Sequence, residues 1–144
     1  MTLEVVEFDT AHVQELIDAQ CSPGLSEWMA HNGNVLETVE HAISVLRNGE
    51  VLFCLGVIHV WGSYGSAWLF MSNKGRDCVF DIFRIGKKFL KETVPFKRIE
   101  ATTNFSNDMH NRFIKLAGFK VEAPLLRNYF PDGGDAVLYA MIKD

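Results

Sequence analysis

The segment from Ala67 to Met71 is apolar at every position. A strand with no polar face has to be covered on both sides, as happens in the centre of a sheet that carries further layers above and below it. The chain has 144 residues, of which 48% are apolar and 22% charged. Its length and composition are typical of a single globular domain. We therefore predict one α/β domain over residues 1–144.

The first third of the chain is expected to be mostly helical. The hydrophobic pattern predicts a strand over Leu3–Phe8 and a helix over Ala11–Ala19. A second helical region is predicted in two pieces, Ser26–His31 and Val35–Arg47. Asn48-Gly49 would stop this region, because glycine favours the end of a helix.

The middle of the chain predicts strands and then a helix. Three extended segments are expected, at Glu50–Cys54, Gly56–Trp61 and Ser66–Met71. A polar loop, Ser72–Asp77, follows them. After this loop, apolar residues recur at helical spacing as far as about Lys91.

The last third alternates between the two kinds of element. A strand is expected at Lys97–Thr102, followed by a helix that Ser106 caps and Gly118 ends. Two further strands are expected, at Lys120–Leu125 and Ala136–Lys143.

The segment from Asn107 to Phe119 begins with asparagine, continues through an amphipathic helix and ends in Gly-Phe before a strand. It resembles the corresponding segment of the GNAT N-acetyltransferase superfamily, and its run His110–Lys115 is similar to small GNAT-like proteins of short-tailed bacteriophages. The element order is also that of the GNAT fold. The resemblance implies an α/β (α+β) fold with a mixed, mostly antiparallel sheet of about six to seven strands and about four helices. The fourth and fifth strands would splay apart.

The resemblance also implies a coenzyme A site on the fourth strand and the loop after it. Main-chain groups at the end of that strand would pair with the pantetheine arm. The loop would hold the pyrophosphate, since the first N–H groups of a helix favour an anion and glycine permits close approach. The expected cofactor-binding residues are Phe70, Met71, Ser72, Lys74, Gly75, Arg76, Asn107 and His110.

The loop departs from the family pattern, which is Gln or Arg, two residues, Gly, one residue, then Gly or Ala. Here the loop supplies a single glycine, Gly75. Asp77 could cap the following helix, or its carboxylate could repel a pyrophosphate. Weakened or lost coenzyme A binding is therefore an alternative. A further one is that the segment is an ordinary strand-to-helix loop of a small α/β domain.

The candidate catalytic residues are Glu100 and His110. Glu100 could accept the proton of an acceptor amine, directly or through water, unless it points to solvent. Where the family commonly carries a tyrosine acid, this chain has Ile114, which cannot donate a proton. His110 could replace that acid or contact the cofactor, because its ordinary pKa is near neutrality, or it could be structural. His59 and Tyr139 are weaker candidates.

Charge divides the chain unevenly, although the net charge is only −4. Arg47 is the first basic residue and eight acidic residues precede it. An anionic first third would attract an amine or a basic protein surface, or it is simply solvated. A basic stripe in the predicted helix before Lys91 suggests a solvated face, and the overall acidity makes nucleic acid an unexpected partner. The stripe consists of Arg84, Lys87, Lys88 and Lys91.

Metal and membrane roles are not predicted. The five histidines have no metalloprotease spacing and no cysteine pairs to complete a metal site. Cys21, Cys54 and Cys78 are odd in number, which favours free thiols and a cytoplasmic location. The longest apolar run, Val51–Trp61, is shorter than the roughly 20 residues that span a bilayer.

Two functions remain open from the sequence. The first is acetyl transfer from acetyl-coenzyme A to an amine of a small molecule or protein, by a monomer or homodimer. The alternative is a catalytically degenerate GNAT-fold phage protein that binds a host protein or is packaged in the virion. Several aromatic residues near loops would suit a protein interface if exposed. They are Trp28, Trp61, Tyr64, Tyr129 and Phe130.

Overall fold

A computed structural model describes residues 2–19 and 25–144, with the backbone alone for residues 25–28 and 31. The chain forms two compact units. Unit 1 comprises Met1–Ile58 and Trp68–Ile82, and unit 2 comprises His59–Ala67 and Phe83–Asp144. Cys21 and the side chain of Trp28 lie outside the described residues.

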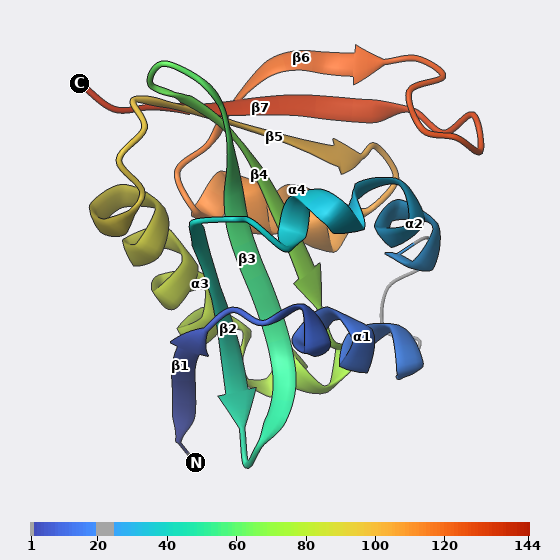
Figure 1. The fold of residues 1–144 in the computed structure, drawn as a ribbon. Coiled ribbons are helices and arrows are strands. Elements are labelled where there is room, and N and C mark those ends of the chain that lie inside the picture. The colour runs from blue at the N-terminus through green and yellow to red at the C-terminus, as the bar shows by residue number, and fades with distance from the viewer. Residues whose placement is uncertain (1, 20–24) are drawn as a thin grey trace. The chain divides into compact units, whose positions relative to one another are not determined.

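Unit 1 holds the N-terminal elements and the central part of the chain (Figure 1). The N-terminus of α1 is fixed by Asp9, whose side chain accepts a hydrogen bond from the backbone N–H of Ala11 at 2.8 Å. The elements that begin in unit 1 are β1 (Leu3–Glu7), α1 (Thr10–Asp18), α2 (Leu25–Leu36), β2 (His41–Arg47), β3 (Glu50–Trp61), the 3-10 helix η1 (Asn73–Cys78) and α3 (Val79–Lys88).

The helix predicted over Val35–Arg47 is wrong. Helix α2 runs through residues 32–34 without a break and ends at Leu36, and residues 41–47 form β2. β2 is antiparallel to both β1 and β3, so that Ser44 lies opposite Val6 and Cys54. Pairing on both edges satisfies the backbone of β2, and this tertiary contribution outweighs the helical spacing of its apolar residues.

The turn after β2 also differs from the prediction. Asn48 and Gly49 have φ angles of 53° and 79°, so they form the two-residue turn of the β2–β3 hairpin instead of ending a helix. β3 continues through Leu55, where two separate strands were predicted. The predicted number of strands is therefore right, but one of them lies in a segment expected to be helical.

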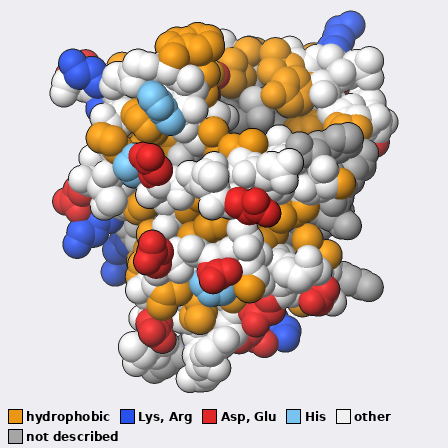
Figure 2. Space-filling view, in the orientation of Figure 1, with side chains coloured by type: hydrophobic (Ala, Val, Ile, Leu, Met, Phe, Trp, Pro, Cys, Tyr) orange, Lys and Arg blue, Asp and Glu red, His pale blue; other side chains and the backbone are white. Residues whose placement is uncertain are grey.

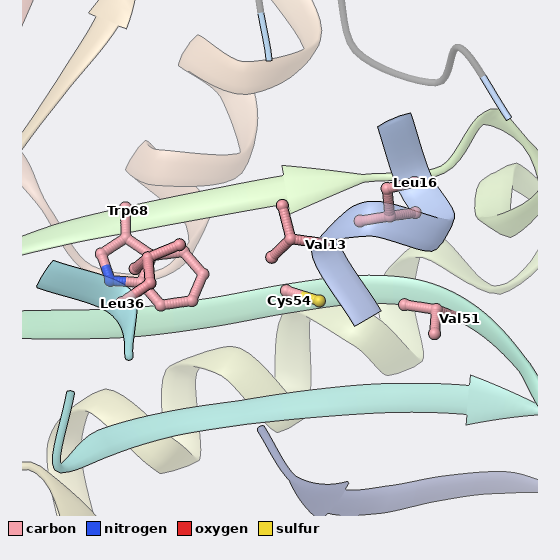
Figure 3. Packing of buried hydrophobic residues seen from close by; sticks show 6 residues of the cluster. All are labelled: Val13, Leu16, Leu36, Val51, Cys54 and Trp68. Atoms are coloured by element: carbon pink, nitrogen blue, oxygen red, sulfur yellow. The ribbon is translucent and has the colours of Figure 1, made fainter. Parts of the chain in front are cut away.

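The apolar core of unit 1 lies between α1, α2 and the sheet (Figure 3). Trp68 of β4 (Tyr64–Met71) packs beside Leu36, and its indole is only 7% exposed. Gly56 makes room for it, since a Cβ at this position would lie 2.3 Å from an indole carbon of Trp68. The buried members of the cluster are Val13, Leu16, Leu36, Val51, Cys54 and Trp68.

Unit 2 contains the tip of the β3–β4 hairpin and the C-terminal half of the chain. Phe83 of α3 contacts Phe113 of α4 edge to face, with ring centroids 4.7 Å apart. Phe113, Ile99 and Tyr139 are buried in its core. The C-terminal elements are the π-helical turn η2 (Phe89–Thr93), β5 (Arg98–Asn104), α4 (Asp108–Leu116), β6 (Lys120–Leu126) and β7 (Ala136–Ile142).

Seven strands form one hydrogen-bonded sheet in the order β1-β2-β3-β4-β5-β7-β6. The β4–β5 pair is parallel, and its register covers Tyr64–Ser66 against Arg98–Glu100. β5 and β6 are each antiparallel to β7. With the four α-helices of residues 2–19 and 25–144, this confirms the predicted mixed, mostly antiparallel α/β architecture.

Candidate functional site

The predicted cofactor residues of β4 and its following loop all lie in unit 1. The loop is folded as η1, which continues directly into α3, so helical structure begins at Asn73 and not at Asp77 as predicted. Ser72 is the N-cap, and its Oγ accepts a hydrogen bond from the backbone N–H of Lys74 at 3.1 Å. Ser72 is itself buried, and its N–H donates to the carbonyl of Leu52 at 2.8 Å.

Gly75 is closely packed. It is buried, and a Cβ there would lie 3.1 Å from Cδ1 of Ile82 and 3.7 Å from Cβ of Leu52. The space around Gly75 is therefore filled by side chains of unit 1. Its absent side chain brings η1 close to β3 and α3, which is a different reason for glycine than the predicted approach of a phosphate.

Two charged groups of η1, Lys74 and Asp77, are paired with residues around the β2–β3 turn. Nζ of Lys74 lies 3.0 Å from a carboxylate oxygen of Glu50. Nη1 of Arg47 lies 2.9 Å from Oδ2 of Asp77, and this pairing holds the pKa of Asp77 below its ordinary value. The Asp77 carboxylate is thus directed at a guanidinium. Arg76 is exposed and adds a further positive charge.

A hollow of about 340 Å³ lies beside η1 in unit 1. The carboxylates of Glu15 and Glu50 and the ammonium of Lys74 border it, so both signs of charge are present. One oxygen of Glu15 accepts the N–H of Val51 at 2.7 Å. Figure 2 shows acidic side chains scattered over the face on which α1 lies, in agreement with the acidic composition of the first third.

Asn107, His110 and Glu100 lie in unit 2. Asn107 is the N-cap of α4, a role predicted for Ser106, and its Oδ1 accepts a hydrogen bond from the N–H of His110 at 3.0 Å. His110 is half-buried, and burial lowers the pKa of its imidazole below the ordinary value. A neutral imidazole is therefore favoured at neutral pH.

Asn111, which the sequence analysis did not single out, fastens the start of α4 to the sheet. Its Nδ2 donates to the carbonyl oxygens of Asn104 at 3.0 Å and Asn107 at 2.8 Å. Its Oδ1 accepts from the hydroxyls of Thr103 at 2.5 Å and Tyr139 at 2.7 Å. This partly buried network gives Tyr139 a structural role, and burial raises the pKa of the phenol.

Glu100 is held in a polar cluster on β5. One carboxylate oxygen accepts a hydrogen bond from the hydroxyl of Tyr64 at 2.6 Å. The other accepts from Nη2 of Arg98 at 2.6 Å. Arg98 also contacts Glu122 of β6 at 2.6 Å, and the two carboxylates raise the pKa of the guanidinium. Both carboxylate oxygens of Glu100 therefore already accept hydrogen bonds from neighbouring side chains.

The two catalytic candidates lie on opposite faces of the sheet in unit 2. Side chains alternate between faces along a strand. Thr103 of β5 points toward α4, where it contacts Asn111, so Glu100 points to the other face. His110 belongs to α4. The structure therefore does not bring Glu100 and His110 together.

The remaining candidates have structural contacts. His59 shares a hydrogen bond of 2.8 Å with the carbonyl of Gly62 and stacks on Phe96 with centroids 4.9 Å apart. Ile114 is 2% exposed, so it is a core residue of unit 2. The described residues contain no group of three or more His, Cys, Asp or Glu side chains placed to hold a metal ion. Among their helices, none is long and apolar enough to cross a membrane.

Solved structures of acetyltransferases share this fold over the whole chain. Ard1 from Thermoplasma volcanium superimposes with a TM-score of 0.75 at 17% sequence identity, covering 100% of this chain and 99% of that one. A second match, from Salmonella typhimurium, modifies the N-terminal serine of a 50S ribosomal subunit protein. Its TM-score is 0.69 at 14% identity, with coverages of 100% and 96%. RimL in complex with coenzyme A superimposes with a TM-score of 0.69 at 15% identity, with the same coverages.

These similarities show that the chain has the GNAT acetyltransferase fold. No protein-family model matches the sequence, and no curated protein matches it.

Proposed function

We propose that this protein transfers an acetyl group from acetyl-coenzyme A to an amine of a small molecule or protein. The observation that carries the proposal is the full-length similarity in fold to acetyltransferases, among them one in complex with coenzyme A. The described register of the β4–β5 pair ends at Ser66 and Glu100, which agrees with the splay that the resemblance implied.

The proposed cofactor residues have suitable chemistry. Lys74 and Arg76 supply exposed positive charge on η1. The negative charge of Asp77 is offset by its ion pair with Arg47. In unit 2, Asn107 and His110 lie at the beginning of α4, where Asn111 holds the backbone. Main-chain groups of residues 70–72, in unit 1, are also proposed to bind the cofactor. Coenzyme A, when bound, would supply the thioester.

The chain's own residues would position the amine and remove its proton. The amine nitrogen forms a bond to the acetyl carbon, the carbon–sulphur bond breaks, and the thiolate that leaves takes up a proton. Glu100 is the proposed base, acting directly or through water. His110, whose lowered pKa favours the neutral form, suits contact with the cofactor or acceptance of a proton better than donation to the thiolate.

The test is an acetylation assay with a panel of amines and protein N-termini. Glu100→Gln should reduce kcat by about a hundredfold if Glu100 is the base. Glu122→Gln is the matched control, because Glu122 contacts the same guanidinium of Arg98 but lies on β6. Equal rates for the wild type and Glu100→Gln would show that Glu100 does not accept the proton.

A second candidate is a GNAT-fold protein that works by docking on another protein, for example a host protein in a phage infection. Two observations favour it. Ile114 is buried where the family commonly carries an acid, and the aromatic side chains of Trp61 and Tyr129 are 71% and 51% exposed. A protein that binds no acetyl-coenzyme A but captures a defined partner would support this alternative.

A further inference from the structure

Arg47 makes an unusual set of contacts at the end of β2. Nη1 donates to both carboxylate oxygens of Asp77, at 3.0 and 2.9 Å. Nη2 donates to the carbonyl oxygen of Lys74 at 2.8 Å. The Arg47 side chain is only 16% exposed. One guanidinium thus binds a side chain and a backbone group at two positions of η1.

These contacts concern a position at which the chain departs from the family pattern. With Gly75 matched to the first glycine of the pattern that the resemblance implied, Asp77 matches its second glycine or alanine. Its carboxylate is 56% exposed, so without a partner it would add negative charge to a segment that is proposed to meet phosphates. The hydrogen bond from Arg47 lowers the pKa of Asp77, so this carboxylate stays ionised. Its negative charge is therefore offset by the positive charge of Arg47 and not by protonation.

We infer that Arg47 is a positioning residue of the proposed cofactor loop: it offsets the Asp77 carboxylate and holds the Lys74 backbone, so that η1 can accept the phosphates of a coenzyme A ligand. The inference rests on the proposed function. It assigns to Arg47 the role of leaving the loop without an uncompensated acid.

The geometry of the guanidinium explains why an arginine is needed. Its donors lie in one plane, so Nη1 can contact both oxygens of Asp77 while Nη2 donates to the Lys74 carbonyl. A lysine is a single charged point and cannot hold Asp77 and the Lys74 carbonyl in the same fixed arrangement. Glu50, on the other side of the β2–β3 turn, contacts the Lys74 ammonium instead. The turn therefore contacts η1 through one cation and one anion.

The experiment compares coenzyme A binding by isothermal titration in four proteins: wild type, Arg47→Gln, Asp77→Asn and the double variant. Glutamine retains a donor for the Lys74 carbonyl but removes the charge. Arg47→Gln should weaken binding about tenfold at low ionic strength, and the loss should shrink as salt is added. Adding Asp77→Asn should restore the affinity to within about twofold, because the acid that Arg47 offsets is then absent.

Lys120→Gln is the control, because it removes one exposed positive charge from β6. Thermal unfolding of each variant shows whether Arg47→Gln has only destabilised η1. Adding Asp77→Asn would not restore binding that was lost for that reason. The inference is overturned if Arg47→Gln binds like the wild type, or if the double variant stays as weak as Arg47→Gln. If the wild type binds no coenzyme A, the proposed function fails first and the inference falls with it.

Discussion

Replacing Gly56 by alanine should destabilise the protein, because the side chain of Trp68 occupies the space that a Cβ would need. That Cβ would lie 2.3 and 2.6 Å from two indole carbons and 2.9 Å from Cβ of Ala42. The indole cannot move away freely, since it is buried and contacts Phe8 and Phe70 at centroid distances of 5.1 and 5.4 Å. We expect a loss of about 1–3 kcal/mol in the free energy of unfolding. The melting temperature should fall by about 3–10 °C.

Urea unfolding followed by circular dichroism measures this loss. Gly33→Ala is a matched control, because Gly33 lies inside α2 and its Cβ would be at an ordinary 3.6 Å from Cε of Met29. This variant should gain about 0.5–1 kcal/mol, since alanine favours a helix more than glycine does. Trp68→Phe should relieve the clash, so the double variant with Gly56→Ala should lose less than the two single losses combined. Unchanged stability in Gly56→Ala would refute the reasoning.

Three further predictions concern buried or half-buried polar groups, and urea unfolding measures all of them. Burial raises the pKa of the Cys54 thiol from 9.0 to about 12, so the unfolded chain loses this proton first and stability should fall above pH 9, by up to about 1.4 kcal/mol per pH unit. Cys54→Ala should make this alkaline decline shallower, and an identical decline would contradict the assignment. Asn111→Ala should cost about 2–4 kcal/mol, because it leaves the hydroxyls of the buried residues Thr103 and Tyr139 without this acceptor; a loss under about 1 kcal/mol would argue against the network. Lys143→Met should cost about 1 kcal/mol, since it removes the ammonium that donates to the Leu90 carbonyl at 2.8 Å, and no loss would show that this contact is not stabilising.

The C-terminal half of the fold could be predicted because its signals are local. The helix after Asn107 has a capping residue, an amphipathic pattern and a glycine, and Gly118 has the left-handed φ of 103° that favours glycine after a helix. The two strands that follow were also predicted to within a few residues. Each of these elements is specified by residues that are neighbours in the sequence.

The segment before Arg47 could not be assigned by periodicity alone. Its apolar residues suit one face of a helix, but β2 is a strand because β1 and β3 pair with it on both edges. The dipeptide Asn48-Gly49 carried the correct signal, since it is the preferred turn of a two-residue hairpin. If Asn48-Gly49 is interpreted as a hairpin turn, the segment before it is predicted to be a strand that ends at Arg47.

The contacts of the candidate site depend on residues far apart in the sequence. Arg47 and Asp77 are 30 positions apart, and Glu100 and Tyr64 are 36 positions apart. No local pattern predicts these pairs. The sequence predicts that Glu100 is an acidic residue on a strand. Only the fold shows that its carboxylate forms an ion pair with Arg98. Whether Glu100 acts as a base stays a prediction.

The most direct test of the proposed function is isothermal titration of acetyl-coenzyme A into the purified protein, together with a mass spectrum for cofactor that copurifies. The acetyltransferase fold and the exposed positive charge of η1 predict saturable binding with a dissociation constant in the micromolar range. Absence of binding up to millimolar ligand would contradict the proposed acetyl transfer and would favour a protein-docking function for the same fold.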